Sequence, residues 1–197
     1  MKEKLENAVK ILKNVLCLLG LATTISAWII IFISVQNNPW FRFTKHAFSD
    51  LGGPHATNSW IFNNGLIFTG TLALLYSFCL IMDSENKIEC IGSAFMIIAS
   101  IFLILIGIFP SGTKPHTFVS LWFFIQLDMT IISWGIGLLL RKWLKLGIFL
   151  TAMGILAPII AMLVPWPSVA IAETYGIVII DIWIILMLRI HFKKRIV

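Results

Sequence analysis

The residues best suited to chemistry lie close together between His46 and His55, in the segment His-Ala-Phe-Ser-Asp-Leu-Gly-Gly-Pro-His. In a short helix, His46 and Asp50 would share a face at a spacing of four residues, with Ser49 beside them. The Gly-Gly-Pro run then predicts a turn that ends this helix. A simpler interpretation is that Ser49 and Asp50 cap backbone amides in an ordered loop, which such residues commonly do.

Other polar side chains lie at the start of long apolar runs or inside them. An unpaired amide or carboxyl group in hydrocarbon is costly, so such side chains usually face the interior of a helix bundle. There they would bind a ligand or, in the alternative interpretation, hydrogen-bond to neighbouring helices. The candidate residues are Asn63, Asn64, His116, Glu173, Asp128 and Asp181.

Two kinds of reactive site are compatible with these residues. The histidines His46, His55 and His116, together with nearby carboxylates, would offer the nitrogen and oxygen ligands that zinc takes, although the sequence has no HExxH motif. Alternatively, Ser49, Asp50 and His116 would supply a nucleophile, an orienting acid and a base. The residue types do not specify a cofactor; zinc is a metal that they would suit, and its ligand set stays open.

The composition indicates that transmembrane helices position these residues. Of the 197 residues, 59% are hydrophobic and 12% are charged, whereas soluble domains average about 25% charged residues. The mean hydropathy is +0.95. A spanning helix needs about 20 apolar residues, and long Leu, Ile and Phe runs without alternation indicate helices. We predict one all-α integral membrane domain over residues 1–197, with six transmembrane helices at residues 11–35, 59–82, 87–109, 117–140, 144–164 and 169–191.

The basic residues predict the orientation of these helices. Twelve of the fifteen Lys and Arg residues, including Lys194 and Arg195, fall at the termini or in the second and fourth turns. The other three, Arg42, Lys45 and Lys114, fall in the remaining loops. Short cytoplasmic loops are enriched in Lys and Arg. We therefore predict a multi-pass protein of the cell membrane whose N- and C-termini are both cytoplasmic.

The cysteines predict no disulfide framework. Cys17, Cys79 and Cys90 lie in or beside apolar runs and form no CxxC pair. Cys79 and Cys90 would face the reducing cytoplasm, where free thiols are expected. His191 lies beside the basic tail, so we expect it at the membrane interface.

Three short blocks of the sequence resemble a known family. They are Ser-Asp-Leu-Gly at 49–52, Ile-Phe-Asn-Asn-Gly-Leu at 61–66, and Gly-Ile-Phe-Pro at 107–110 followed by His116. Their order and placement resemble the prokaryotic six-helix membrane family called domain of unknown function 998, over essentially the whole chain. A more distant similarity is to the Frag1/DRAM/Sfk1 group, whose members are linked to membrane lipid organisation. Without assigning a reaction, the resemblance implies candidate functional positions at Ser49, Asp50, Asn63 and His116.

These observations predict a polytopic membrane protein of an uncharacterised family, with a polar pocket on its outer face that binds a lipid or another amphiphile. We expect Asp50, Asn63 and His116 to meet in that pocket, with Ser49 nearby, because they lie at similar depth on different segments. One alternative is an intramembrane lipid hydrolase or acyltransferase that uses His116, Asp50 and Ser49 or a metal.

A second alternative is a small proton- or cation-coupled transporter that uses Asp128, Asp181 and Glu173. The sequence contains no detectable inverted repeat, which disfavours this function. The net charge of +6 is divided into short groups between apolar runs, so we expect no nucleic-acid partner. The expected partners are membrane lipids, and a homo-oligomer is compatible with the sequence.

Overall fold

Most of the chain is helical in the computed structural model, which describes residues 1–193. Lys194 and Arg195 of the basic tail lie outside the described residues. The helices, of which η1 is a short 3₁₀ helix in the first loop, are α1 (Lys2–Gln36), η1 (Phe48–Gly52), α2 (Ser59–Asp83), α3 (Lys87–Ile108), α4 (His116–Leu140), α5 (Leu144–Leu163) and α6 (Val169–Lys193). The six α-helices of the described residues are long and apolar enough to span a membrane, which confirms the predicted all-α membrane fold.

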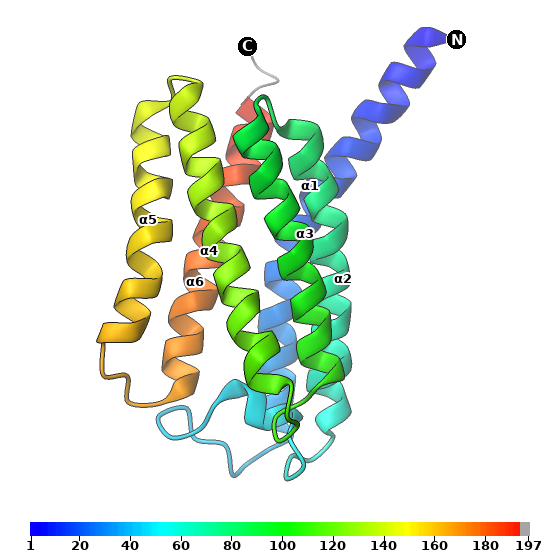
Figure 1. The fold of residues 1–197 in the computed structure, drawn as a ribbon. Helices are drawn as coiled ribbons and strands as arrows, with labels where there is room; N and C mark the ends of the chain where they lie inside the picture. The colour runs from blue at the N-terminus through cyan, green and yellow to red at the C-terminus, as the bar shows by residue number, and fades with distance from the viewer. Residues whose placement is uncertain (194–197) are drawn as a thin grey trace.

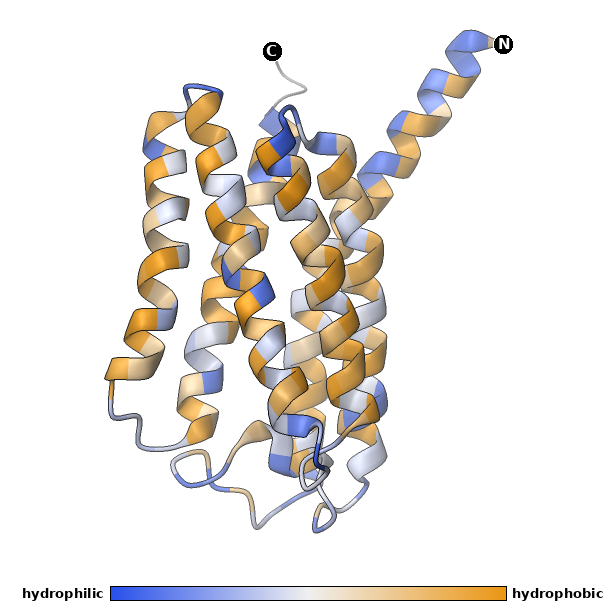
Figure 2. Ribbon diagram, in the orientation of Figure 1, coloured by the Kyte–Doolittle hydropathy of each residue, from blue (hydrophilic) through white to orange (hydrophobic). Residues whose placement is uncertain are grey.

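The first helix is longer than the apolar run that predicted it. α1 begins at Lys2, whereas the predicted span begins at residue 11. The intervening residues contain no Gly or Pro and are mostly strong helix formers, so the helix continues beyond its apolar part. Its 35 residues extend over about 52 Å, against a hydrocarbon thickness of about 30 Å. The N-terminal turns project beyond the bundle (Figure 1), and they carry hydrophilic residues (Figure 2).

Consecutive helices run in opposite directions, so both termini lie at one end of the bundle together with the α2–α3 and α4–α5 turns (Figure 1). We call this end the terminal end, and the opposite end, which carries residues 37–58, 109–115 and 164–168, the loop end. From α1 to α5, each helix packs against the next in sequence, and α6 contacts α1, α4 and α5. Glycine permits close helix approach: a Cβ atom at Gly70 would lie 2.9 Å from the Ile104 backbone nitrogen of α3.

Two clusters of buried side chains hold the bundle together. The larger cluster lies toward the terminal end and includes Tyr76, Trp134 and Trp183, each of which is at most 1% exposed. The smaller cluster lies at the loop end and contains Ile31, Phe48, Leu51, Phe62 and Ala170. A cavity lies between the two clusters.

Hydrogen bonds hold the first loop against the helices. The buried Asn38 side chain donates from Nδ2 to the Ser34 carbonyl and accepts at Oδ1 from the Thr57 backbone N–H at 2.7 Å, which fastens both ends of the loop. Ser168, just before α6, donates its hydroxyl hydrogen to the Phe43 carbonyl at 2.6 Å. The loop is therefore ordered and able to position η1 over the bundle.

The short helix of the first loop begins later than the sequence predicts. η1 begins at Phe48, and Ala47 before it is extended, with φ −100° and ψ 151°. His46 and Asp50 therefore do not share a helical face. The reason is local: Asp50 Oδ2 accepts a hydrogen bond from the Ala47 backbone N–H at 2.9 Å, and this cap marks the start of the helix.

The prediction of unpaired cysteines is wrong for two of the three. Cys17 of α1 and Cys79 of α2 form a disulfide, with their Cα atoms 5.1 Å apart. Cys90 is free and exposed. The paired residues are 62 positions apart in the sequence, and the antiparallel packing of α1 against α2 brings them to the same depth. Cysteine counting gives no information about which helix faces meet, so it could not find this pair.

Candidate functional site

A cavity of about 130 Å³ lies between the two buried clusters, in the loop-end half of the bundle. Side chains from α1, α2, α3, α4 and α6 line it, and Phe48 and Ser49 of η1 line its loop end. Its walls are mainly apolar and include Ile31, Phe62, Leu66, Phe123, Ile177 and Ile180. The cavity is therefore a largely hydrophobic space within the transmembrane region.

Two carboxylates interrupt this apolar lining. Glu173 and Asp181 of α6 are the only ionisable side chains among the described residues that line the cavity, and they lie about 12 Å apart along the helix axis. Glu173 Oε2 accepts from the Phe48 backbone N–H at 2.7 Å, and Asp181 Oδ2 accepts from the Trp28 indole N–H at 2.8 Å. Because an ionised carboxylate can accept about four hydrogen bonds, both groups retain acceptor capacity.

The start of α6 places Glu173 against η1. The Ser168 hydroxyl oxygen accepts from the Ile171 backbone N–H at 3.2 Å and caps the first turn. The Ala170 backbone N–H donates to the His46 carbonyl at 2.9 Å, so the first turn is also bound to the loop. Glu173 follows one turn later and reaches the N-terminal end of η1.

Threonine hydroxyls contribute polar atoms to the cavity but few free donors. Thr23 and Thr24 of α1 both line the cavity. Their hydroxyl groups donate to carbonyls of their own helix, those of Leu19 and Leu21, at 2.8 and 3.0 Å. Such bonds engage the hydroxyl hydrogen and leave the oxygen as an acceptor. Like the two carboxylates, these groups suit a ligand that donates hydrogen bonds or carries positive charge.

The three predicted catalytic residues lie in separate environments. Ser49 lines the cavity, and Asp50 caps η1 through the Ala47 backbone N–H. His116 Nδ1 lies 2.9 Å from the Phe109 carbonyl oxygen and bridges the loop before α4. No hydrogen bond joins Ser49, Asp50 and His116 to one another in the part of the chain that the structure describes. Their catalytic roles stay a prediction.

Two predicted ligand-binding residues hold the loop backbone. Asn63 Nδ2 donates to the Gly52 carbonyl at 3.0 Å and ties η1 to α2. His46 Nδ1 accepts from the Arg42 backbone N–H at 2.8 Å within the first loop. These contacts position η1 above the cavity. The structure thus brings Asp50 and Asn63 to the same short helix, where both bind backbone groups.

The remaining predicted ligand-binding residues divide into two groups. Glu173 and Asp181 line the cavity. His55 and Asn64 are exposed, and Asp128 is half-buried on α4 outside the cavity lining. The cavity therefore unites two of the three acids that the sequence predicted for a transport path.

Metal-ligating side chains gather at the terminal end rather than at the loop end. Among the described residues, Cys17, Cys79, Asp83 and His191 form the one group of such side chains close enough to share an ion, and we call it the terminal cluster. His191, which we expected at the membrane interface, is only 3% exposed and lies inside the bundle. Its Nδ1 atom lies 2.7 Å from Asp83 Oδ2. The sequence offered one signal for this cluster, which is the presence of polar residues in the parts of α1, α2 and α6 that lie at the terminal end of the bundle.

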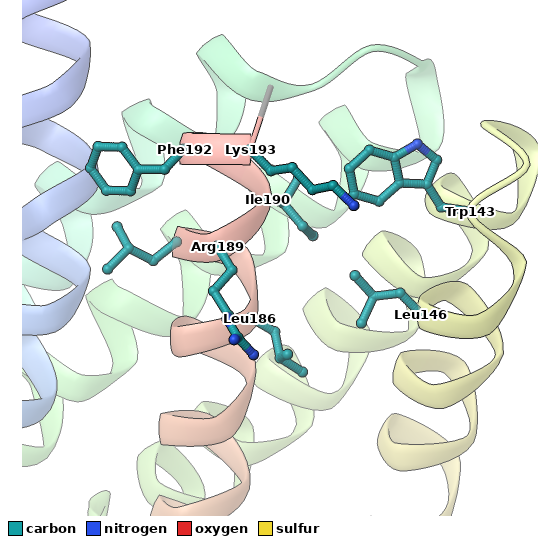
Figure 3. A pocket seen from close by; sticks show the side chains of 8 residues that line it. Trp143, Leu146, Leu186, Arg189, Ile190, Phe192 and Lys193 are labelled. Atoms are coloured by element: carbon teal, nitrogen blue, oxygen red, sulfur yellow. The ribbon is translucent and has the colours of Figure 1, made fainter. Parts of the chain in front are cut away.

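A second pocket, of about 660 Å³, opens at the terminal end between α5 and α6. Figure 3 shows Trp143 and Leu146 on one side of it and Leu186, Arg189 and Lys193 of α6 on the other. The Lys193 Nζ atom lies 5.6 Å from the centroid of the Trp143 ring, within the range of a cation–π contact. This pocket carries basic side chains, in contrast to the acidic cavity at the loop end.

Comparison with known proteins identifies the family of the chain. No curated protein and no solved structure was found to match it. A family model matches residues 21–190, a region that contains every residue lining the acidic cavity. The match confirms the resemblance based on the three sequence blocks. The chain is therefore a polytopic membrane protein that belongs to the family described as Protein of unknown function (DUF998).

Proposed function

We propose that this membrane protein binds a cationic amphiphile in the cavity beneath η1. The observation that carries the proposal is the presence of Glu173 and Asp181 in a mainly apolar, otherwise uncharged lining that has no Lys, Arg or His among its described residues. A partly buried carboxylate in a mainly apolar cavity is stabilised by a paired cation, and apolar walls favour hydrocarbon. A molecule with an ammonium head and an apolar body satisfies both requirements.

The size and polarity of the cavity limit what it holds. Its volume of about 130 Å³ is close to that of an engineered cavity of about 150 Å³ that binds benzene. This space suits an ammonium group and a short stretch of hydrocarbon rather than the two acyl chains of a phospholipid. The engaged hydroxyl hydrogens of Thr23 and Thr24 offer little to a phosphate group.

Binding of octylammonium to the full chain in lipid nanodiscs tests this function. Octanol has the same hydrocarbon chain without the charge, and octanoate carries the opposite charge. We expect saturable binding of octylammonium by calorimetric titration, after subtraction of its partitioning into empty nanodiscs, and much weaker binding of the other two compounds. Equal binding of all three, or no saturable binding of octylammonium, would contradict the proposal.

Removal of either cavity charge is expected to weaken this binding. Glu173→Gln and Asp181→Asn keep the approximate shape of the side chain but remove its negative charge. A hydrogen bond to a charged group contributes about 1.5–3 kcal/mol, so each change should raise the Kd of octylammonium by about tenfold or more. Asp128→Asn is the matched control, because Asp128 lies outside the lining, and its Kd should equal that of the wild type. A similar loss in all three variants would argue against a specific site.

Transport of a cation is the second candidate, because Glu173 and Asp181 share one cavity. Transport requires a path from the cavity to the terminal end. The packed cluster around Tyr76, Trp134 and Trp183 lies in that direction, which favours binding over transport. Uptake of octylammonium into liposomes by the wild-type protein, lost in Asp181→Asn, would favour transport instead.

The proposal includes an orientation in the cell membrane, with the terminal end in the cytoplasm, because most Lys and Arg residues lie there. In a Cys90→Ser background, a cysteine replacing His55, which is exposed at the loop end, should react with an impermeant thiol reagent in intact cells. A cysteine replacing Lys87, exposed at the start of α3, should react only after lysis. The reverse labelling pattern would place the terminal end outside.

A further inference from the structure

The terminal cluster combines four metal-ligating side chains from three helices. Cys17 comes from α1, Cys79 and Asp83 come from α2, and His191 comes from α6, and all four are buried. Their ligand atoms lie within 4.8 Å of one another. We propose that the terminal cluster, with its two cysteines reduced, binds a zinc ion through two thiolates, one imidazole and one carboxylate.

The distances within the cluster suit a tetrahedral zinc ion. Zinc–ligand distances of about 2.0–2.3 Å separate neighbouring ligand atoms by roughly 3.3–3.8 Å. Asp83 Oδ2 lies 3.8 Å from Cys17 Sγ and 3.7 Å from Cys79 Sγ. It lies 2.7 Å from His191 Nδ1. Zinc binding therefore requires that the disulfide open and that the histidine and aspartate separate slightly, both of which are side-chain movements.

Asn14 determines which nitrogen of His191 faces the cluster. His191 Nε2 lies 3.2 Å from Asn14 Oδ1, which is an acceptor, so Nε2 carries the hydrogen. A neutral imidazole then directs its Nδ1 lone pair at Asp83 Oδ2. Two acceptors so close together need a cation between them, and either a proton or a metal ion fills that role. Zinc-binding histidines are commonly oriented by such a hydrogen bond from their other nitrogen.

Lys13 provides the charge that the site needs. Its Nζ atom lies 2.6 Å from Asp83 Oδ1, so the other carboxylate oxygen is left to face the two sulfur atoms. Two thiolates and one carboxylate carry three negative charges against the two positive charges of zinc. The Lys13 ammonium group brings the total to zero, which reduces the penalty of burying an isolated net charge.

Reduction of the disulfide precedes zinc binding. In the orientation proposed above, the terminal end faces the reducing cytoplasm, where disulfides rarely persist. Two low-molecular-weight thiols transfer two electrons and two protons to the Cys17–Cys79 disulfide and leave as a disulfide of their own. Zinc then replaces the two thiol protons, which pass to solvent.

Cobalt titration of the full chain in detergent micelles tests the proposal. The protein is reduced with a phosphine, freed of reductant without oxygen, and titrated with Co²⁺. We expect the visible d–d bands of a tetrahedral ion and a thiolate-to-cobalt charge-transfer band in the near ultraviolet, both saturating at one ion per chain. Zinc should abolish these bands, and the unreduced protein should not develop them.

Single substitutions identify the ligands. Cys17→Ser and Cys79→Ser should each lose about half or more of the charge-transfer band, and His191→Gln should raise the Kd for zinc by about tenfold or more. Cys90→Ser, which removes the exposed free cysteine, is the matched control and should keep the full spectrum.

Three results would overturn the zinc site. The first is that reduced wild-type protein lacks the cobalt bands. The second is that the bands survive both Cys17→Ser and Cys79→Ser. The third is that the disulfide stays intact in folded protein treated with the phosphine. The comparison of reduced with unreduced wild-type protein needs no substitution, so it decides the question even where a variant fails to fold.

Discussion

Replacing Arg141 by methionine is expected to lower the free energy of unfolding by about 3–5 kcal/mol. Arg141 follows the last turn of α4, and its guanidinium group contacts Glu85 between α2 and α3 and Glu89 in the first turn of α3. Nη1 lies 3.3 Å from Glu89 Oε1, and Nε lies 2.8 Å from Glu85 Oε2. The Glu89 side chain is 0% exposed, so removal of the guanidinium group leaves a buried carboxylate without its cation.

Unfolding by denaturant in mixed micelles, followed by tryptophan fluorescence, measures this loss. Lys145→Met is the matched control, because Lys145 is exposed at the start of α5, and it should change the free energy by less than about 0.5 kcal/mol. Combining Arg141→Met with Glu89→Gln should recover much of the loss, since the amide removes the buried charge. Equal stability of the Arg141 and Lys145 variants would show that the ion pair does not stabilise the fold.

The transmembrane helices can be predicted from the sequence because each is an apolar run long enough to cross a bilayer. The predicted starts of α2 to α6 agree with the structure to within one residue. α1 differs, because its first turns are stabilised by helix-forming residues rather than by apolar ones. Hydropathy therefore identifies the part of a helix that lies in the membrane but not its full length.

Contacts between helices cannot be predicted in the same way. A soluble helix reveals its buried face by an apolar stripe, whereas these helices are apolar on all sides because lipid surrounds the bundle. The disulfide between Cys17 and Cys79 and the contact between His191 and Asp83 depend on which faces meet. Nothing in the spacing of these residues indicates their pairing.

The candidate site is predictable in part. Carboxyl groups inside apolar runs must avoid lipid, which correctly draws attention to Glu173 and Asp181. The same reasoning selects Asn63, and the polar loop segment selects Asp50, yet both side chains bind the backbone of the first loop. Trp28 is missed, because an indole within an apolar run is typical of a hydrophobic residue, yet its N–H group binds Asp181. Residue type identifies the polar groups that need partners. Only the fold shows whether such a group binds the backbone or faces a cavity.

Ala27→Phe is expected to raise the Kd of octylammonium by about a hundredfold or more. Ala27 lines the cavity from α1, and an added phenyl ring would occupy much of its volume of about 130 Å³. The substitution deletes no hydrogen bond, because the alanine side chain has none to make. Each buried methylene group contributes about 0.8 kcal/mol, so excluding about four of them from the cavity accounts for a loss of this size.

The position of the added ring decides the interpretation. Ile29→Phe enlarges the same helix on its outer face, where Ile29 is 52% exposed, and should leave the Kd unchanged. Titration of both variants in nanodiscs provides the comparison, with thermal unfolding showing that each remains folded. The charge variants Glu173→Gln and Asp181→Asn weaken any site that uses these acids, including one on the surface, whereas Ala27→Phe blocks only a ligand inside the cavity. If octylammonium bound Ala27→Phe and the wild type equally well, its site would lie outside the cavity, and the proposed function would fail even though the acids contribute to binding.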